Sequence, residues 1–195
     1  MTARQALKTI GDLRSGYHYR SAKDLQPGDD AKYRAVQLGS LTEDNQIDWG
    51  NLDLIDFKGD PERYLLHDGD VLVPLRGMRM LATLVKQPPD NALVIGQWAI
   101  LSPHPGLIDS RYLTGYLNHP RMQHRLASLS RGSGISFISM KDLSDMKVHV
   151  PSLGRQQQIA RVVELRQKER TLIGQLEQLK DKLVNAATMQ AAIED

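Results

Sequence analysis

The sequence has no cysteine among its 195 residues, which excludes disulfides and thiolate metal sites and favours a reducing cytosol as its setting. It also lacks any apolar run approaching the roughly 18 residues that a membrane-spanning helix needs. Its N-terminus has no hydrophobic segment of the kind that directs export. We therefore expect a cytoplasmic protein with no membrane partner.

Patterns of known catalytic chemistry are also missing. The six histidines never form a HExxH or comparable ligand pattern, and neither G-x-S-x-G nor a dinucleotide-binding fingerprint occurs. Asp56-Phe57-Lys58 does match the D-x-K half of a metal-dependent nuclease signature, with Asp48 or Asp53 upstream. Because so short a pattern of common residues arises by chance in most chains, a nuclease is kept only as an alternative. We expect a binding protein without catalytic residues, metal site or cofactor.

Apolar residues recur every three or four positions through the C-terminal part of the chain. This seam consists of Val162, Leu165, Leu172, Leu176, Leu179, Leu183, Ala186 and Ile193, with the polar residues Glu169 and Gln190 in the same register. A period of 3.5 residues is typical of a coiled coil. A helix from about Arg155 onward would be roughly 60 Å long at about 1.5 Å per residue. It needs a partner helix to bury the seam, unless it folds back on its own domain, which remains the alternative.

The charges along this segment favour one orientation of the partner. Residues 151–170 carry five basic and two acidic side chains, a net charge of +3, whereas residues 171–195 carry two basic and four acidic ones, a net charge of −2. Two copies packed antiparallel place opposite charges beside each other at both ends. Each exposed pair contributes only a few tenths of a kcal/mol, so the charges bias orientation and do not create the dimer.

Residues 1–150 have the usual size of one domain with its own core, and residues 151–195 form the long helix. Patterning predicts strands over 32–38, 71–75, 80–85, 92–101, 135–138 and 147–150, and helices over 2–10, 109–117 and 120–129. Ser139 and Asp142 have the spacing of a capping box for one further helical turn. The expected fold class is α+β: a mixed, strand-rich domain followed by one long coiled-coil helix.

Basic residues concentrate in one zone, residues 111–150, where six basic and two acidic side chains give a net charge of +4. Such a zone on a balanced domain favours a polyanion site, although a solvated basic face is the competing explanation. Arg121, His124 and Arg125 share one face of the expected helix.

Three loops add candidate contacts for nucleic acid. Arg76-Gly77-Met78-Arg79 lies between two expected strands, where arginines reach a groove or simply cap a solvated hairpin. Arg131 and Ser133 flank glycines that allow close approach to a phosphate backbone. Tyr17 and Arg20 lie in an aromatic and basic loop, where packing of the tyrosine on the core is at least as favourable an interpretation.

The segment from Arg131 to Ala160, RGSGISFISMKDLSDMKVHVPSLGRQQQIA, resembles the specificity subunits of type I restriction–modification systems. The shared order is a glycine loop, a short strand, a one-turn helix, a strand, Pro-x-Leu and a Gln-Gln-Ile-Ala helix start. Gly69-Asp70-Val71-Leu72 also looks like that family's Gly-Asp-Ile-Leu strand. A full specificity subunit has two target recognition domains and two conserved helices, whereas this chain has one of each. It therefore looks like a half subunit.

The resemblance implies a function. The chain would dimerise through antiparallel helices, each domain would read half of a split DNA site, and the site would be an inverted repeat with a fixed gap. Methylation would belong to a separate methyltransferase subunit that uses S-adenosylmethionine, and cleavage to a translocating restriction subunit. The expected DNA contacts are Tyr17, Arg20, Arg76, Arg79, Arg121, Arg125, Arg131 and Ser133. The alternative is a coiled-coil adaptor or decoy that binds the methyltransferase without reading DNA.

Overall fold

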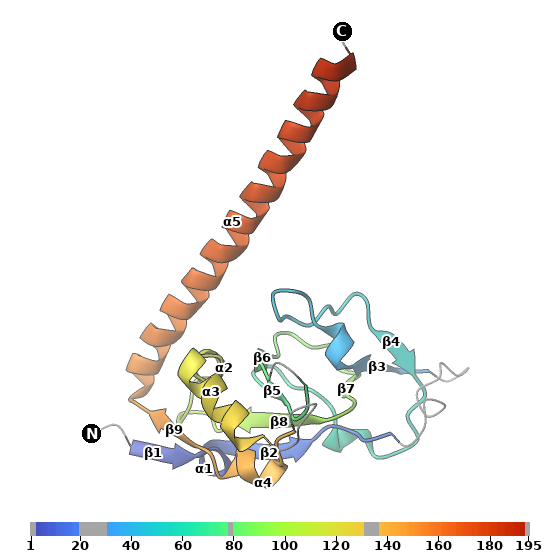
Figure 1. The fold of residues 1–195 in the computed structure, drawn as a ribbon. Helices are drawn as coiled ribbons and strands as arrows, with labels where there is room; N and C mark the ends of the chain where they lie inside the picture. The colour runs from blue at the N-terminus through green and yellow to red at the C-terminus, as the bar shows by residue number, and fades with distance from the viewer. Residues whose placement is uncertain (1–2, 20–30, 78–79, 131–136, 194–195) are drawn as a thin grey trace. The chain divides into compact units, whose positions relative to one another are not determined.

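The computed structural model describes residues 3–19, 31–77, 80–130 and 137–193 (Figure 1). Its strands are β1 (Ala3–Ala6), β2 (Gly11–Ser15), β3 (Tyr33–Val36), β4 (Asp53–Ile55), β5 (Val71–Pro74), β6 (Thr83–Leu84), β7 (Ala92–Val94), β8 (Trp98–Pro103) and β9 (Lys147–Val150). Its helices are α1 (Leu7–Ile10), α2 (Ser110–Leu117), α3 (Pro120–Leu129), α4 (Met140–Ser144) and α5 (Leu153–Ile193), with 3-10 turns η2 (Leu38–Ser40) and η3 (Pro61–Arg63). These elements confirm the mixed α+β class with a long C-terminal helix.

A four-stranded antiparallel sheet in the order β2-β8-β5-β6 lies at the centre of the domain. Leu72 of β5 pairs with Ile100 of β8, and Leu101 of β8 pairs with Leu13 of β2. All four residues of β5 are buried, so this strand is covered on both faces. A short, continuous apolar run is typical of such a strand, and the prediction over 71–75 is confirmed.

Two smaller sheets flank the central one. In the first, β3 lies antiparallel to β4 and parallel to β7. In the second, β1 pairs antiparallel with β9, so that Ala3 faces Val150 and Ala6 faces Lys147 (Figure 1). The second sheet joins the two ends of the domain in sequence.

One apolar cluster connects the central sheet to the sheet of β3, β4 and β7. Its buried members are Val36, Ile47, Leu52, Leu66, Leu72, Val85, Ala92, Val94, Trp98 and Ile100. Trp98, the first residue of β8, is only 2% exposed. Because side chains of both sheets share this core, the two sheets are held as one body.

The single strand predicted over residues 92–101 is wrong, because two strands in different sheets occupy this stretch. β7 and β8 are separated by Gly96, whose φ of 99° lies in the left-handed region that favours glycine. The residues before and after this turn are buried, and only Gly96 and Gln97 interrupt the apolar pattern between them. So short an interruption concealed a change of sheet.

The opening helix predicted over residues 2–10 is only partly correct. Residues Ala3–Ala6 are the strand β1, and only Leu7–Ile10 are helical. The strand forms because β9 supplies hydrogen-bond partners from the far end of the domain, and this tertiary pairing overrides local helix propensity. The strand predicted over 80–85 is also shorter than expected, since β6 spans only Thr83–Leu84.

The helix-start signals are confirmed. Asp109 caps α2 by accepting hydrogen bonds from Arg111 N and Tyr112 N, and Pro120 occupies the first turn of α3. Ser139 Oγ accepts from Asp142 N at 3.0 Å and caps α4. These signals are local, so they act within a few residues of where the sequence shows them.

The contacts divide the chain into two compact units, residues 1–157 and 158–195. Most of α5 forms the second unit, and its seam residues are exposed: Val162 66%, Leu165 56%, Leu172 64%, Leu176 51%, Leu179 63%, Leu183 71% and Ile193 76%. Ala186 is also exposed. The predicted long helix is confirmed as one element, Leu153–Ile193, and it carries an exposed apolar stripe. Among the described residues, no helix has both the length and the hydropathy to cross a lipid bilayer.

Candidate nucleic-acid interface

Arg76 stands at the end of the buried strand β5, where the chain emerges at the surface. Leu75 is 3% exposed and Arg76 is exposed. Arg76 forms an antiparallel β-bridge with Phe137, and Ile138 N donates to Leu75 O at 2.9 Å. The first side of the loop after β5 is thus held by the segment that precedes α4.

Side-chain amides hold the other side of the same loop. Ala82 N donates to Asn118 Oδ1 at 2.7 Å, and Asn118 Nδ2 donates to Ala82 O at 2.8 Å. Gln123 Nε2 donates to Met80 O at 3.2 Å and to Leu117 O at 2.8 Å. Asn118 follows α2 and Gln123 lies on α3, so the helices fix the strand that returns from the loop. Local sequence patterns did not predict either contact with the loop, because the loop residues lie more than thirty residues away from both amides.

A buried ion pair lies behind the start of β5. Asp70 is 3% exposed and accepts hydrogen bonds from Arg14 Nη2 at 2.7 Å, Ser102 Oγ at 2.6 Å and His67 N at 3.0 Å. Arg14 lies on β2 and Ser102 on β8, so the carboxylate links β5 to both strands. The Gly-Asp turn therefore has a structural role, which is to fix the start of β5, the strand that leads to Arg76.

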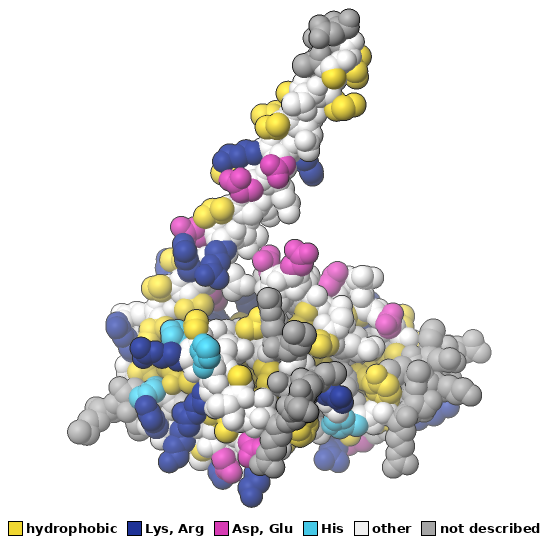
Figure 2. Space-filling model, in the orientation of Figure 1, with side chains coloured by type: hydrophobic (Ala, Val, Ile, Leu, Met, Phe, Trp, Pro, Cys, Tyr) yellow, Lys and Arg dark blue, Asp and Glu magenta, His cyan; other side chains and the backbone are white. Residues whose placement is uncertain are grey.

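Helix α3 presents basic side chains to solvent along one face. Met122 and Leu126 are buried, whereas Arg121, His124 and Arg125 are exposed. The predicted common face is therefore present. Figure 2 shows Lys and Arg side chains, with His beside them, gathered over the side of the domain where α2, α3 and β9 lie.

The sheet of β1 and β9 adds further basic residues beside α3. Arg125 Nη1 donates to Lys147 O at 3.4 Å, which places α3 beside β9. On the neighbouring strand β1, Arg4 Nε donates to His149 Nε2 at 3.0 Å. The pairing of β1 with β9 brings Arg4 to this surface, and no local sequence signal predicts that pairing. We call Arg4, Arg121, Arg125 and Lys147 the basic surface.

Tyr17 lies in an aromatic cluster and is half-buried. Its ring contacts Phe57 at 4.8 Å and Tyr64 at 5.4 Å between centroids, both edge to face. Its backbone N donates to Val94 O at 2.8 Å. Tyr17 therefore packs against other aromatic rings, which was one of its two expected roles. A contact of Tyr17 with DNA stays a prediction. The remaining candidates Arg20, Arg79, Arg131 and Ser133 lie outside the described residues.

The nuclease alternative gains no geometric support. Lys58 Nζ lies 3.6 Å from Asp56 Oδ2, and Asp48 Oδ1 accepts from Gly50 N in its own turn. In the described part of the chain, no three His, Cys, Asp or Glu side chains converge as metal ligands would.

Ionisable groups near α2 have shifted pKa values. Burial raises the pKa of Tyr112 to about 12, with a further contribution from Tyr116, and the Tyr112 hydroxyl donates to His149 O at 2.9 Å. Burial opposes ionisation of Asp109, but hydrogen bonds from the Arg111 side chain and from backbone N–H groups outweigh it and lower the pKa of Asp109. Both groups stabilise the start of α2 and its contact with β9.

The start of α5 is anchored by a side chain that is fully buried. Gln156 is 0% exposed; its Oε1 accepts from Asp109 N at 2.8 Å, and its Nε2 donates to Leu107 O at 3.1 Å and Pro151 O at 2.8 Å. No local sequence signal predicts this role, because Asp109 and Leu107 lie more than forty residues away. The amide bonds to three backbone groups, so neither of its own buried polar atoms is left without a partner.

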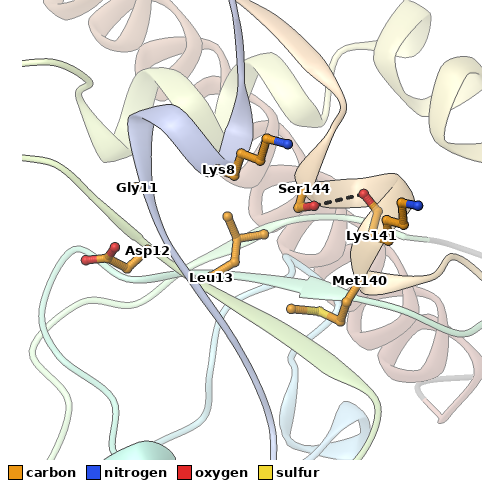
Figure 3. A pocket seen from close by; sticks show the side chains of 7 residues that line it. All are labelled: Lys8, Gly11, Asp12, Leu13, Met140, Lys141 and Ser144. Atoms are coloured by element: carbon orange, nitrogen blue, oxygen red, sulfur yellow. Dashed lines mark hydrogen bonds between the residues drawn. The ribbon is translucent and has the colours of Figure 1, made fainter.

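An open pocket of about 380 Å³ lies between α1, β2 and α4 (Figure 3). Its lining comprises Lys8, Gly11, Asp12, Leu13, Met140, Lys141 and Ser144. Lys8 Nζ is already paired with Asp145 Oδ1 at 2.6 Å, and this pair lowers the pKa of Asp145. Because Asp12 adds negative charge, the pocket does not concentrate positive charge as the basic surface does.

A basic helix face is a feature of many nucleic-acid-binding domains. The family model for the type I restriction modification DNA specificity domain matches residues 6–180. The chain therefore belongs to this family. No curated protein sequence matches it significantly.

Solved structures share the fold at low sequence identity. The S subunit of a type I restriction-modification system from M. genitalium has a TM-score of 0.60 at 16% identity, covering 93% of this chain and 43% of that one. The HsdS subunit from Thermoanaerobacter tengcongensis gives 0.60 at 15%, covering 89% and 39%. A third structure comes from a study of complex assembly and conformational transition of the type I R-M system. It has a TM-score of 0.63 at 15% sequence identity, covering 88% of this chain and 39% of that one. This chain thus spans about two fifths of the length of each.

Proposed function

We propose that this chain is a non-catalytic, half-length DNA specificity subunit of a type I restriction–modification system. Two copies pair through antiparallel α5 helices and read an inverted repeat with a fixed gap. They direct a separate methyltransferase subunit, and through it a restriction subunit, to that site in the cytoplasm. In this proposal residues 1–150 are the target recognition domain and residues 151–195 the dimerisation and spacer helix.

The observation that carries the proposal is the exposed seam of α5 in a chain of this family. Leu172, Leu179 and Leu183 each expose more than 60% of their surface, and burying one such side chain contributes about 1.5–3 kcal/mol. The seam repeats with the 3.5-residue period of a coiled coil. A second copy of α5 supplies a matching seam with complementary end charges. It also restores the two domains that a two-part DNA site requires.

The basic surface supports DNA as the ligand. Arg121 and Arg125 lie on one exposed helix face, and Lys147 joins them through the hydrogen bond from Arg125 to its carbonyl. Arg76 projects from an anchored loop, and its guanidinium is suited to bidentate contact with guanine. Phosphate contacts then position the domain while loop residues read base edges.

Two measurements on the purified full chain test this function. Sedimentation should show a dimer at micromolar concentration. Selection of bound duplexes from randomised DNA should enrich an inverted repeat with a constant gap. Leu179→Glu should weaken dimerisation by more than tenfold, because the interface would bury unpaired carboxylates. Gln178→Glu, one residue away and off the seam, should leave the dimer intact.

A monomer that binds no duplex, or a dimer that binds a methyltransferase subunit but enriches no DNA sequence, contradicts the proposal. The second result supports the adaptor. Magnesium-dependent cutting by the chain alone would favour the nuclease.

A further inference from the structure

Phe137 lies beside Arg76 at the surface, and the proposed function gives Phe137 no role. The two residues are opposite each other in an antiparallel β-bridge. Directly opposed residues project from the same face, with Cβ atoms about 4.5–5.5 Å apart. Arg76 is exposed, and Phe137 exposes 41% of its surface. A cation and an aromatic ring therefore stand side by side and face solvent.

The backbone beneath this pair is fixed by buried neighbours. Leu75 is 3% and Ile138 1% exposed, and Ile138 N donates to Leu75 O at 2.9 Å. Arg76 and Phe137 are thus exposed residues that lie next to buried ones in their own segments. An aromatic side chain on so fixed a backbone loses little conformational freedom when it meets a ligand.

The two phenylalanines of the chain have opposite environments. Phe57 packs against Tyr17 and Tyr64. Phe137 instead lies on the face that carries Arg76. A single exposed apolar residue is ordinary on a protein surface. What distinguishes Phe137 is its register opposite the arginine at the end of β5, beside the loop whose other side Asn118 and Gln123 hold.

We infer that Arg76 and Phe137 together read a thymine–guanine step in the major groove. Arg76 donates to O6 and N7 of the guanine, and the Phe137 ring packs on the C5-methyl group of the adjacent thymine. Successive bases of one strand are about 3.4 Å apart and the opposed Cβ atoms about 4.5–5.5 Å, so the two side chains are near enough to contact neighbouring bases. The inference rests on the proposed DNA-recognition function and adds to it a specificity residue and the base step that it selects.

Base substitution in a bound duplex tests the pair without altering the protein. The full chain is first used to enrich its site from randomised duplexes, and we expect a T–G step in each half-site. Deoxyuridine in place of that thymine removes only the methyl group. Binding should weaken about fourfold per half-site, the effect of removing one buried methyl group.

The variants Phe137→Ala and Leu54→Ala complete the experiment. Leu54 is a matched control, 43% exposed but on β4 in another sheet. In Phe137→Ala, thymine and deoxyuridine duplexes should bind equally, whereas Leu54→Ala should keep the wild-type difference. A double-mutant cycle between side chain and methyl group isolates this interaction. Arg76→Lys should reduce the preference for guanine, because lysine lacks the bidentate fork.

The possible outcomes distinguish failure of the Arg76–Phe137 inference from failure of the proposed DNA-recognition function. If the wild-type chain enriches a DNA site but does not distinguish thymine from deoxyuridine at any position, the Arg76–Phe137 inference fails and the DNA-recognition function stands. If it enriches no DNA, both fail. Because the wild-type comparison needs no variant, misfolding of Phe137→Ala does not obscure the result.

Discussion

Individual buried polar side chains hold the domain together where apolar packing alone leaves backbone groups without partners. Asp70 joins β5 to β2 and β8, and Gln156 joins the first turn of α5 to the segment before α2. Burial of such a group is costly unless each of its polar atoms has a partner. Both residues therefore matter through their full set of hydrogen bonds.

Gln156→Glu should lower the free energy of unfolding by about 2–4 kcal/mol. The amide donates to the carbonyls of Leu107 and Pro151, whereas a carboxylate places negative charge against both. Urea unfolding of the full chain measures the change. Gln157→Glu makes the same chemical change at an exposed neighbour and should be nearly neutral. Equal effects in the two variants would show that the amide of Gln156 does not anchor the helix.

Tyr112 makes stability depend on alkaline pH. Its pKa rises from 10.0 in the unfolded chain to about 12 in the folded domain. Below pH 10 both states hold the proton, and its contribution is complete. Between pH 10 and about 12 only the unfolded chain loses the proton, so stability falls as pH rises through this window.

Tyr112→Phe should remove this part of the alkaline fall. The variant should also lose about 1 kcal/mol at neutral pH, because the hydrogen bond to His149 O is gone. Unfolding free energies at pH values below 10 and between 10 and 12 give both quantities. Tyr33→Phe, in the aromatic cluster, is the control. An unchanged alkaline slope in Tyr112→Phe would assign the fall to other groups.

Some helices and strands could be predicted from their own sequence, and others could not. Helices α2, α3 and α4 were predicted because Asp109, Pro120 and Ser139 act on adjacent backbone. Strands β1 and β7 were missed or merged because their partners are remote. The candidate site divides in the same way. The basic face of α3 follows from helical spacing, whereas Arg4 and Phe137 enter only through pairing with distant strands.

The orientation of paired α5 helices can be tested because the chain has no cysteine. In an antiparallel pair, Cys introduced at Leu165 lies far from its own copy but near the other end of the partner seam. Leu165→Cys should therefore not crosslink to itself. Leu176→Cys or Leu179→Cys, near the middle of the seam, should form a disulfide-linked dimer.

Non-reducing electrophoresis after mild oxidation measures these crosslinks. Mixing Leu165→Cys with Ala186→Cys or Ile193→Cys should give a mixed dimer. A parallel pair instead predicts efficient self-crosslinking at every one of these positions, which would exclude the antiparallel arrangement.

The whole molecule should bind DNA with a salt dependence set by its basic surface. Each neutralised phosphate contributes about 0.9 to the slope of log K against log salt concentration. Arg121→Ala with Arg125→Ala should weaken binding to all sequences and reduce the slope by about 1 for each phosphate that is no longer neutralised. Lys32→Ala removes an exposed charge at the edge of β3 and should leave the slope unchanged. A double variant with a wild-type slope would show that other residues bind the phosphates.

The pairing of β1 with β9 also sets an order of events during synthesis. At about 5–20 residues per second, roughly 7–30 s separate translation of the two strands. Until β9 emerges from the ribosome, the edge of β1 lacks the partner with which it pairs in the finished domain. The helix α5 follows β9 in the chain, so β9 becomes available to β1 before the end of α5 becomes available to a second polypeptide.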